Sequence, residues 1–543
     1  MITELKKFVT KSSKQSIAAA AMVVAFFGII SRILGLVRDR ILAAQYGAGD
    51  ALDVYYASFR LPDLIFELLV AGALGAALIP VFSKLITKEN KNRAWRAVNS
   101  VFIVVVVIMS LLAVVGIIFA PLLMHVIVPG FPAEKMDETV NLARIMFLSP
   151  ILLSASAVLG GVLVSFRRFV LYSMAPIFYN VGIIIGATVI APRIGLTGLA
   201  WGVVLGAFFH FLVHVTAASL ARVKVIKLTQ SPFKNRDVKK ILTLMLPRMF
   251  SSASNQISLL LITFFASMLA SGSLTVFSFA INIQSVVLGL VGVPFAVAAF
   301  PVLSKKFAIH EEDAFARVLS QTLRRILYYA VPLSMIFFVL REQIVRVVYG
   351  AGHFNIEDTV LTYQVLGILC ISLFAQSVIP LLARGFYAMQ NTKIPFYVAL
   401  VSQAVNIILI VLFMGPLKIY AIAIAFSLTA ITNASLLFII LHRHIESCEY
   451  KNTSRTFIQI VISTFVAFVV MYFVRNILSI CIPLEFVLGV LAQLLITGGI
   501  GIAVYLFVTA VFGMKEFETI KKKIIIKIFG KAQVAQEEQN IAR

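Results

Sequence analysis

The sequence predicts an all-α protein that crosses a membrane about fourteen times, and two observations carry this prediction. First, 60% of the 543 residues are hydrophobic and only 13% are charged, a balance outside the range of soluble globular domains. Second, apolar runs of about 20 residues, the length that an α-helix needs to cross a bilayer, recur along the whole chain. The runs are continuously apolar rather than alternating, which excludes a transmembrane β-barrel.

Polar or basic segments separate the apolar runs and set the limits of the predicted spans to within several residues. Several runs are longer than a minimal span, which indicates tilted helices or helices that extend beyond the bilayer. The predicted spans are 17–46, 54–83, 97–128, 139–166, 170–191, 197–221, 241–269, 274–303, 326–350, 359–388, 394–414, 419–441, 457–477 and 486–512.

The formal net charge of +23 comes from bases that gather mostly between and after the apolar runs. Alternate loops are basic, as at Arg167 and Arg168, and the loops between them hold few bases and some acids. This alternation follows the positive-inside rule, so we expect both termini in the cytoplasm and bases that face anionic lipid rather than nucleic acid. Segment 311–325 is expected to form a short amphipathic helix at the cytoplasmic surface, with a plain solvated helix as the alternative.

An internal repeat divides the chain. Ala77–Lys84 parallels Ala298–Lys305, and Ala175–Tyr179 parallels Ile394–Tyr397, with an offset of about 220 residues that further ordered matches share. Each unit then holds an even number of about six spans, which predicts two parallel lobes around a central cavity. The predicted divisions are an N-lobe at 1–228, a C-lobe at 229–445, two extra spans within 446–514 and a basic cytoplasmic tail at 515–543.

Charged side chains in the first two predicted spans are the main functional candidates. A charge at membrane depth costs at least ~2.5–3.5 kcal/mol on insertion scales, so such residues usually face a protein interior or a water-filled cavity. The equivalent segment of the second repeat, 270–303, carries no charge, and Asn282 is its candidate binding residue. The charged residues of the first repeat are Arg32, Arg38, Asp39, Asp53, Arg60, Asp63 and Glu67.

The two arginines of the first span are expected to bind a phosphate-bearing anion. The planar guanidinium group of arginine makes bidentate contacts with a diphosphate and stays charged. Arg32 and Arg38 are about 240° apart around a straight helix, so a bend at Gly35 is needed to bring both to one cavity. For Arg38 and Asp39, ion pairs with other helices are the alternative.

The acidic candidates are expected to form a charge network with a gating role. For Asp39 a structural ion pair is the favoured interpretation, and for Asp53 it is the capping of a helix. Asp63 and Glu67 are spaced i, i+4 on one helical face, where they either hold a proton or a cation or neutralise nearby arginines.

Two further arginines, Arg60 and Arg248, are candidate binding residues. Pro247 precedes Arg248, and the polar run 251–256 follows it, which indicates a bent helix lining a cavity. The alternative is that Arg248 extends to the cytoplasmic headgroups.

Motifs for enzymatic chemistry are not found in the sequence. It holds no nucleophile elbow, P-loop or HExxH motif, and Cys370, Cys448 and Cys481 form no CxxC pair. His210 and His214 are spaced i, i+4 without an acidic third ligand, so we expect them at the membrane interface and predict no metal or cofactor. An integral-membrane glycosyl- or phosphotransferase stays open as an alternative, because the motifs of such enzymes are short.

The stretch from Ser31 to Asp39 (SRILGLVRD), followed by Ala71–Phe82, resembles the N-terminal signature of the MurJ/MviN family of lipid II flippases. This family lies within the multidrug/oligosaccharidyl-lipid/polysaccharide (MOP) exporter superfamily. The resemblance continues through Ala270–Ser273, Pro301–Lys305 and Arg384–Ala388, so it covers essentially the whole chain.

The resemblance implies fourteen helices and a central cationic cavity. It also implies export of lipid II, the undecaprenyl-diphosphate-linked peptidoglycan precursor, to the outer leaflet of the bacterial cytoplasmic membrane by alternating access. Arg32, Arg38, Asp39 and Asp53 match family positions of functional importance. The sodium site of some members is not supported, because the spans 241–269 and 394–414 hold no acid; the membrane potential is the expected driving force.

Two positions depart from the family pattern. Phe66 and Asn282 stand where many members carry arginine, and Arg60 or Arg248 is expected to compensate. The alternative substrate is another polyprenyl-linked glycan, of the O-antigen or capsule type. A cationic-drug exporter of the same superfamily is disfavoured, because it requires acids in the cavity. We expect a monomer.

Overall fold

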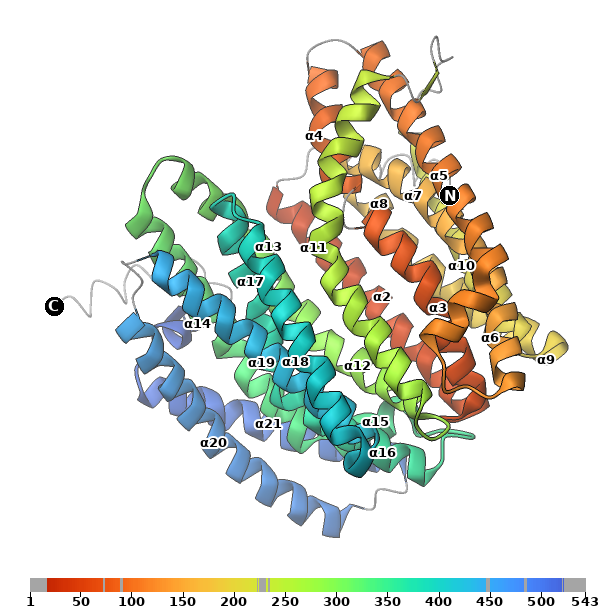
Figure 1. The fold of residues 1–543 in the computed structure, drawn as a ribbon. Helices are drawn as coiled ribbons and strands as arrows, with labels where there is room; N and C mark the ends of the chain where they lie inside the picture. Colours follow the sequence, from red (N-terminus) through yellow and green to blue (C-terminus); the bar gives the residue numbers. More distant parts are fainter. Residues whose placement is uncertain are drawn as a thin grey trace. The chain divides into compact units, whose positions relative to one another are not determined.

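The structure is a computed structural model, and the part of the chain that it describes is helical throughout (Figure 1). It describes residues 17–71, 74–87, 91–221, 223, 231–232, 235–445, 450–482, 486–519 and 521.

The helices follow one another with short connections, and two π-helical turns, η2 and η3, interrupt the α-helices. Such turns often mark functional positions in membrane helices. The elements are α2 (Ile17–Tyr46), α3 (Asp50–Phe66), η2 (Glu67–Ala71), α4 (Leu74–Thr87), α5 (Lys91–Ile127), α6 (Ala133–Met146), α7 (Leu148–Ser165), α8 (Phe169–Ile185), η3 (Gly186–Ile190), α9 (Ala191–Ile194), α10 (Thr197–Leu220), α11 (Arg236–Ser267), α12 (Ser273–Leu290), α13 (Gly292–Ala308), α14 (Glu312–Val339), α15 (Arg341–Tyr349), α16 (Ile356–Ile371), α17 (Leu373–Ala388), α18 (Lys393–Leu417), α19 (Ile419–His444), α20 (Tyr450–Cys481) and α21 (Val487–Val511).

The described residues contain ten helices that are long and apolar enough to cross a membrane, and α16 with α17 adds an eleventh if this pair, bent by 46°, is one span. These coincide with eleven of the predicted spans, which confirms the all-α membrane class. The other predicted spans, 17–46, 54–83 and 241–269, are helical as α2, as α3 with α4, and as α11, and they carry the charged or polar residues discussed below. A total of fourteen spans stays a prediction.

The chain forms two compact units, which we call the first and the second unit. The first comprises Met1–Phe279 with Tyr349–Asp358, and the second comprises Ala280–Val348 with Thr359–Arg543. The division between the units falls inside α12, because α11 packs against α4 and α5 of the first unit. The lobe limits taken from the sequence repeat are not tested by this division and stay predictions.

The order of elements follows the repeat offset of about 220 residues. Helix α5 begins at Lys91 and α14 at Glu312, while α10 begins at Thr197 and α19 at Ile419. The parallel orientation of the two repeats stays a prediction.

The core of the first unit lies between α4, α5, α7 and α11. Phe82 and Trp95 pack at its centre, and Trp95 stacks on Phe166 with ring centroids 5.8 Å apart. Beside it, glycines bring α8 and α10 into backbone contact: a Cβ on Gly202 would lie 2.6 Å from the Gly186 Cα atom. Small residues at i, i+4 spacing permit this close approach of membrane helices, where backbone contact replaces the hydrophobic effect.

We expect Gly202→Ala to destabilise the protein by about 1–3 kcal/mol, because the added methyl group forces α8 and α10 apart. The measurement is thermal unfolding of the purified protein in detergent. Gly499→Ala in α21 is the matched control, since a Cβ there meets nothing within 4 Å and alanine favours the helix. Equal melting temperatures for the two variants would contradict the assigned role of the glycine contact.

The core of the second unit lies between α13, α14, α17 and α19. The two C-terminal helices pack against α14: the Tyr505 hydroxyl donates to the Tyr328 carbonyl oxygen at 2.8 Å, and the Tyr328 and Thr509 hydroxyls lie 3.1 Å apart. Segment 311–325 does not form a separate surface helix. It is the first half of α14, with Phe315 and Leu319 buried in the core, because its apolar face continues the face of the predicted span.

Candidate functional site

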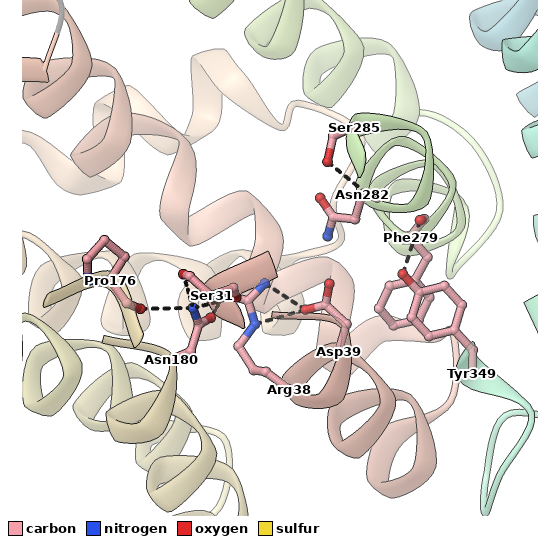
Figure 2. Close-up of polar contacts among 9 residues, drawn as sticks. All are labelled: Ser31, Arg38, Asp39, Pro176, Asn180, Phe279, Asn282, Ser285 and Tyr349. Atoms are coloured by element: carbon pink, nitrogen blue, oxygen red, sulfur yellow. Dashed lines mark hydrogen bonds and ion pairs between the residues drawn. The ribbon is translucent and has the colours of Figure 1, made fainter. Parts of the chain in front are cut away.

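Helix α2 carries the charged cluster that the sequence singles out. Arg38 Nε and Nη2 both donate to Asp39 Oδ1, at 2.9 and 2.7 Å, and Arg38 Nη1 donates to Asn180 Oδ1 of α8 at 3.2 Å (Figure 2). Asn180 Nδ2 in turn donates to the Pro176 and Ser31 carbonyl oxygens. Asp39 is only 1% exposed, whereas the Arg38 side chain keeps 20% of its surface exposed. Arg38 is therefore held in place and still accessible.

Arg38 and Asp39 form an ion pair with each other on α2. A binding role for Arg38 stays a prediction. The side-chain amide of Asn180 orients the guanidinium group from α8. The asparagine is a residue that the sequence interpretation missed; the signal was a lone amide in an otherwise apolar run.

Arg32 lies on the same helix, and α2 runs without a break through Gly35. Its side chain is exposed in the structure. The apolar run containing Arg32 covers all faces of α2, so hydropathy does not show which face packs inward.

The Asp53 carboxylate accepts hydrogen bonds from two backbone N–H groups and one hydroxyl, and it also pairs with a lysine. Its Oδ1 accepts from the Thr275 backbone N–H at 2.9 Å and from the Thr275 hydroxyl at 2.8 Å, and its Oδ2 accepts from the Gly272 N–H at 2.9 Å. Asp53 therefore binds the first turn of α12 rather than its own helix α3, whose N-cap is Gly49. Lys135, which the sequence interpretation missed, completes the site: its Nζ donates to Asp53 Oδ2 at 3.0 Å and also binds Asp50.

Three loops of the first unit meet around Asp53, and glycine is required where they touch. A Cβ on Gly272, whose φ is +84°, would lie 2.0 Å from the Ala48 carbonyl oxygen. A Cβ on Gly352, with φ +60°, would lie 2.2 Å from the Ala44 carbonyl oxygen. The Asp358 carboxylate accepts from the Ala48 N–H at 3.0 Å. Segment 349–358 is thereby bound to the loop after α2 by backbone contacts.

The remaining candidates lie near one another, since Asp63 interacts electrostatically with Arg60, Glu67 and Arg38. Arg60 Nε donates to the Thr263 hydroxyl of α11 at 2.7 Å, so this arginine is bound to a neutral partner. Asp63 is exposed, and Glu67 is the first residue of the π-helical turn η2, where the regular i, i+4 register of α3 ends.

Two candidates lie outside the first unit or outside the described side chains. Asn282 belongs to the second unit, and its carbonyl oxygen accepts from the Ser285 hydroxyl at 2.8 Å (Figure 2). The backbone of Arg248 lies in α11, but its side chain is outside the described residues, as is most of the polar run 251–256.

The two histidines of α10, His210 and His214, pack against α7, and their position at the membrane interface stays a prediction. His214 is buried and partly stacked on Tyr172, and Nδ1 of both His210 and His214 lies 2.7 Å from the Ser156 hydroxyl of α7. They therefore bind within the helix bundle. Within the described part of the chain no three His, Cys, Asp or Glu side chains form a group that could hold a metal ion.

The fold is similar to that of solved membrane transporters. A structure described as the inward-facing conformation of a multidrug resistance MATE family transporter of the MOP superfamily gives a TM-score of 0.66 at 14% identity, with 79% of this chain and 99% of that one covered. A structure described as lipid II flippase MurJ in an inward closed conformation gives a TM-score of 0.73 at 22% identity, with 90% and 98% covered.

Sequence comparison then gives the family. Residues 42–497 match the model of the family described as lipid II flippase MurJ. A probable lipid II flippase MurJ from Rhizobium tropici is 31% identical over 452 residues, which are 81% of this chain and 84% of the relative. The chain belongs to the lipid II flippase MurJ family, which comprises multi-pass membrane transporters and not enzymes.

Proposed function

We propose that the chain is a flippase that moves lipid II from the cytoplasmic to the outer leaflet of the bacterial cytoplasmic membrane by alternating access. The observation that carries the proposal is the family match over residues 42–497, which includes most of the helices of both units. Cytoplasmic termini are part of the proposal and rest on the distribution of basic residues.

Arg38 is the proposed binding residue for the diphosphate. A diphosphate presents several oxygens and more negative charge than one carboxylate, so it competes with Asp39 for the guanidinium group. Asn180 keeps that group oriented while the partner changes, because its amide oxygen accepts from Nη1. Arg32 adds a second cation to the same helix.

The proposed driving force is the membrane potential, and no cofactor is part of the proposal. A potential that is negative inside favours outward movement of an anion by ~2.3 kcal/mol per charge per 100 mV. Transport of an anionic headgroup along this gradient requires no dedicated cation site.

We expect Arg32→Ala to abolish transport without loss of folded protein, because its side chain is exposed and substitutions at exposed positions change stability little. The measurement is translocation of fluorescent lipid II in proteoliposomes, with the melting temperature as a check on folding. Arg193→Ala, at an exposed position of α9, is the control and should transport normally. Normal transport by the Arg32 variant would remove this residue from the site.

Reconstitution also tests the proposed function itself. Proteoliposomes receive lipid II together with a nucleotide sugar, and both the leaflet and the chemical identity of the lipid are followed. Movement without chemical change supports the flippase, and formation of a new product would instead support a transferase.

Another substrate class stays the alternative. The family resemblance implies arginine at the positions of Phe66 and Asn282, so another polyprenyl-linked glycan is the alternative cargo. Depletion of the endogenous lipid II flippase of a bacterial host distinguishes the two. Restored growth supports lipid II, whereas failure despite good membrane expression supports the alternative.

A further inference from the structure

We propose that the second unit holds an additional anion site, which takes the phosphate of an anionic phospholipid headgroup or of a free phosphate ester. A cavity of about 520 Å³ lies between α14, the start of α20 and the segment that follows α21. None of the residues that line it belongs to the candidate site described above. Its charged lining residues are Arg324, Arg325, Arg455, Lys515 and Glu516.

Glu516, the acid among these charged lining residues, pairs with Arg324. Glu516 Oε1 lies 3.7 Å from Arg324 Nε, and the two side chains are only 12% and 11% exposed. Arg324 Nη1 also donates to the Thr453 hydroxyl at 3.4 Å. The pair therefore forms a largely buried wall of the cavity rather than an open binding group.

The other bases face the cavity from three different segments. Arg325 of α14, Arg455 of α20 and Lys515 are all exposed, and they form no ion pair with any residue that the structure describes. Three cations gathered in this way repel one another, so an anion between them removes that repulsion. Two of them are arginines, whose guanidinium groups suit phosphate oxygens.

The turn after α21 forms one side of the cavity. Gly513 has φ +60°, and its N–H donates to the Ala510 carbonyl oxygen while the Met514 N–H donates to that of Thr509, which is the Schellman pattern of a helix end. Met514 is 3% exposed and anchors the turn in the core of the second unit. The turn ends α21, and the chain that follows it places Glu516 beside Arg324 of α14.

The surroundings suit a lipid headgroup. Val511 and Phe512, which precede the turn, are 71% and 39% exposed, so apolar side chains lie next to the basic cavity. Basic pockets between membrane helices are typical sites for anionic lipid headgroups, with the acyl chains along the apolar surface. The neutral lining residues Asn452, Thr456 and Thr519 supply hydrogen-bonding groups for the alcohol part of a phosphate ester.

Lipid binding to the full-length protein in detergent tests the proposal. Phosphatidylglycerol, phosphatidylcholine and glycerol 1-phosphate are titrated separately, and binding is followed by native mass spectrometry and by the melting temperature. We expect binding of phosphatidylglycerol and not of phosphatidylcholine. The double variant Arg325→Gln/Arg455→Gln should bind phosphatidylglycerol about tenfold more weakly or worse.

The matched control is Arg317→Gln/Arg443→Gln, which removes the same charge from exposed positions of the second unit that do not line the cavity. Its affinity should stay unchanged. Equal weakening in both double variants, or none in either, would overturn the proposal. Binding of glycerol 1-phosphate that is lost in the cavity variant identifies a free phosphate ester as the source, and binding of the lipid alone identifies a headgroup.

Discussion

Replacing Arg38 by glutamine is expected to abolish lipid II translocation. The guanidinium group is held by Asp39 and Asn180 and is still accessible, because 20% of the Arg38 side chain is exposed. Glutamine keeps hydrogen-bonding capacity but removes the charge that a diphosphate requires. Losing a charged hydrogen-bonding contact to a buried or partly buried anion costs about 2–5 kcal/mol, so transport should fall at least about 30-fold. The measurement is the initial rate in proteoliposomes.

The single variant also leaves the Asp39 carboxylate buried without its cation, which by itself destabilises a protein by about 3–5 kcal/mol. The double variant Arg38→Gln/Asp39→Asn removes both charges and should be folded, yet inactive. Asp39→Asn alone keeps the cation and should still bind lipid II. If the double variant is folded and transports normally, Arg38 is not a binding residue.

Asp53→Asn is expected to destabilise the protein by about 3–5 kcal/mol. The carboxylate accepts from two backbone N–H groups and one hydroxyl of the 272–275 segment, and it pairs with Lys135. An amide cannot accept all of these contacts, and it leaves the Lys135 ammonium group, only 9% exposed, with Asp50 alone. Thermal unfolding in detergent measures the effect.

Asp50→Asn is the matched control, because Asp50 binds the same lysine but its side chain is 65% exposed. Exposed ion pairs contribute little, so a change within about 0.5 kcal/mol is expected. A loss for Asp50→Asn as large as that for Asp53→Asn would show that the lysine, and not the turn of α12, determines the stability of this cluster.

The roles of the two aspartates show where sequence reasoning reached its limit. For Asp39 the favoured interpretation is a structural ion pair, and the structure shows that its carboxylate pairs with the adjacent Arg38. Asp53 is expected from the sequence to cap a helix, and it binds the first turn of α12 rather than its own helix α3. Its contact there, Thr275, lies 222 residues further along the chain. Spacing along one helix identifies a capping residue, but it does not show which helix end is brought to it.

The sequence by itself determined the membrane class, eleven of the spans and the concentration of charge in α2 and α3. These properties are local, because the length of an apolar run and the cost of a charge within it depend only on neighbouring residues. The tertiary structure alone decided the partners: Asn180 for Arg38, Thr263 for Arg60, and Lys135 with the 272–275 turn for Asp53. Each of these contacts joins residues more than 80 positions apart in the sequence. The residues meet because the helices pack together and because glycines allow backbones to approach closely.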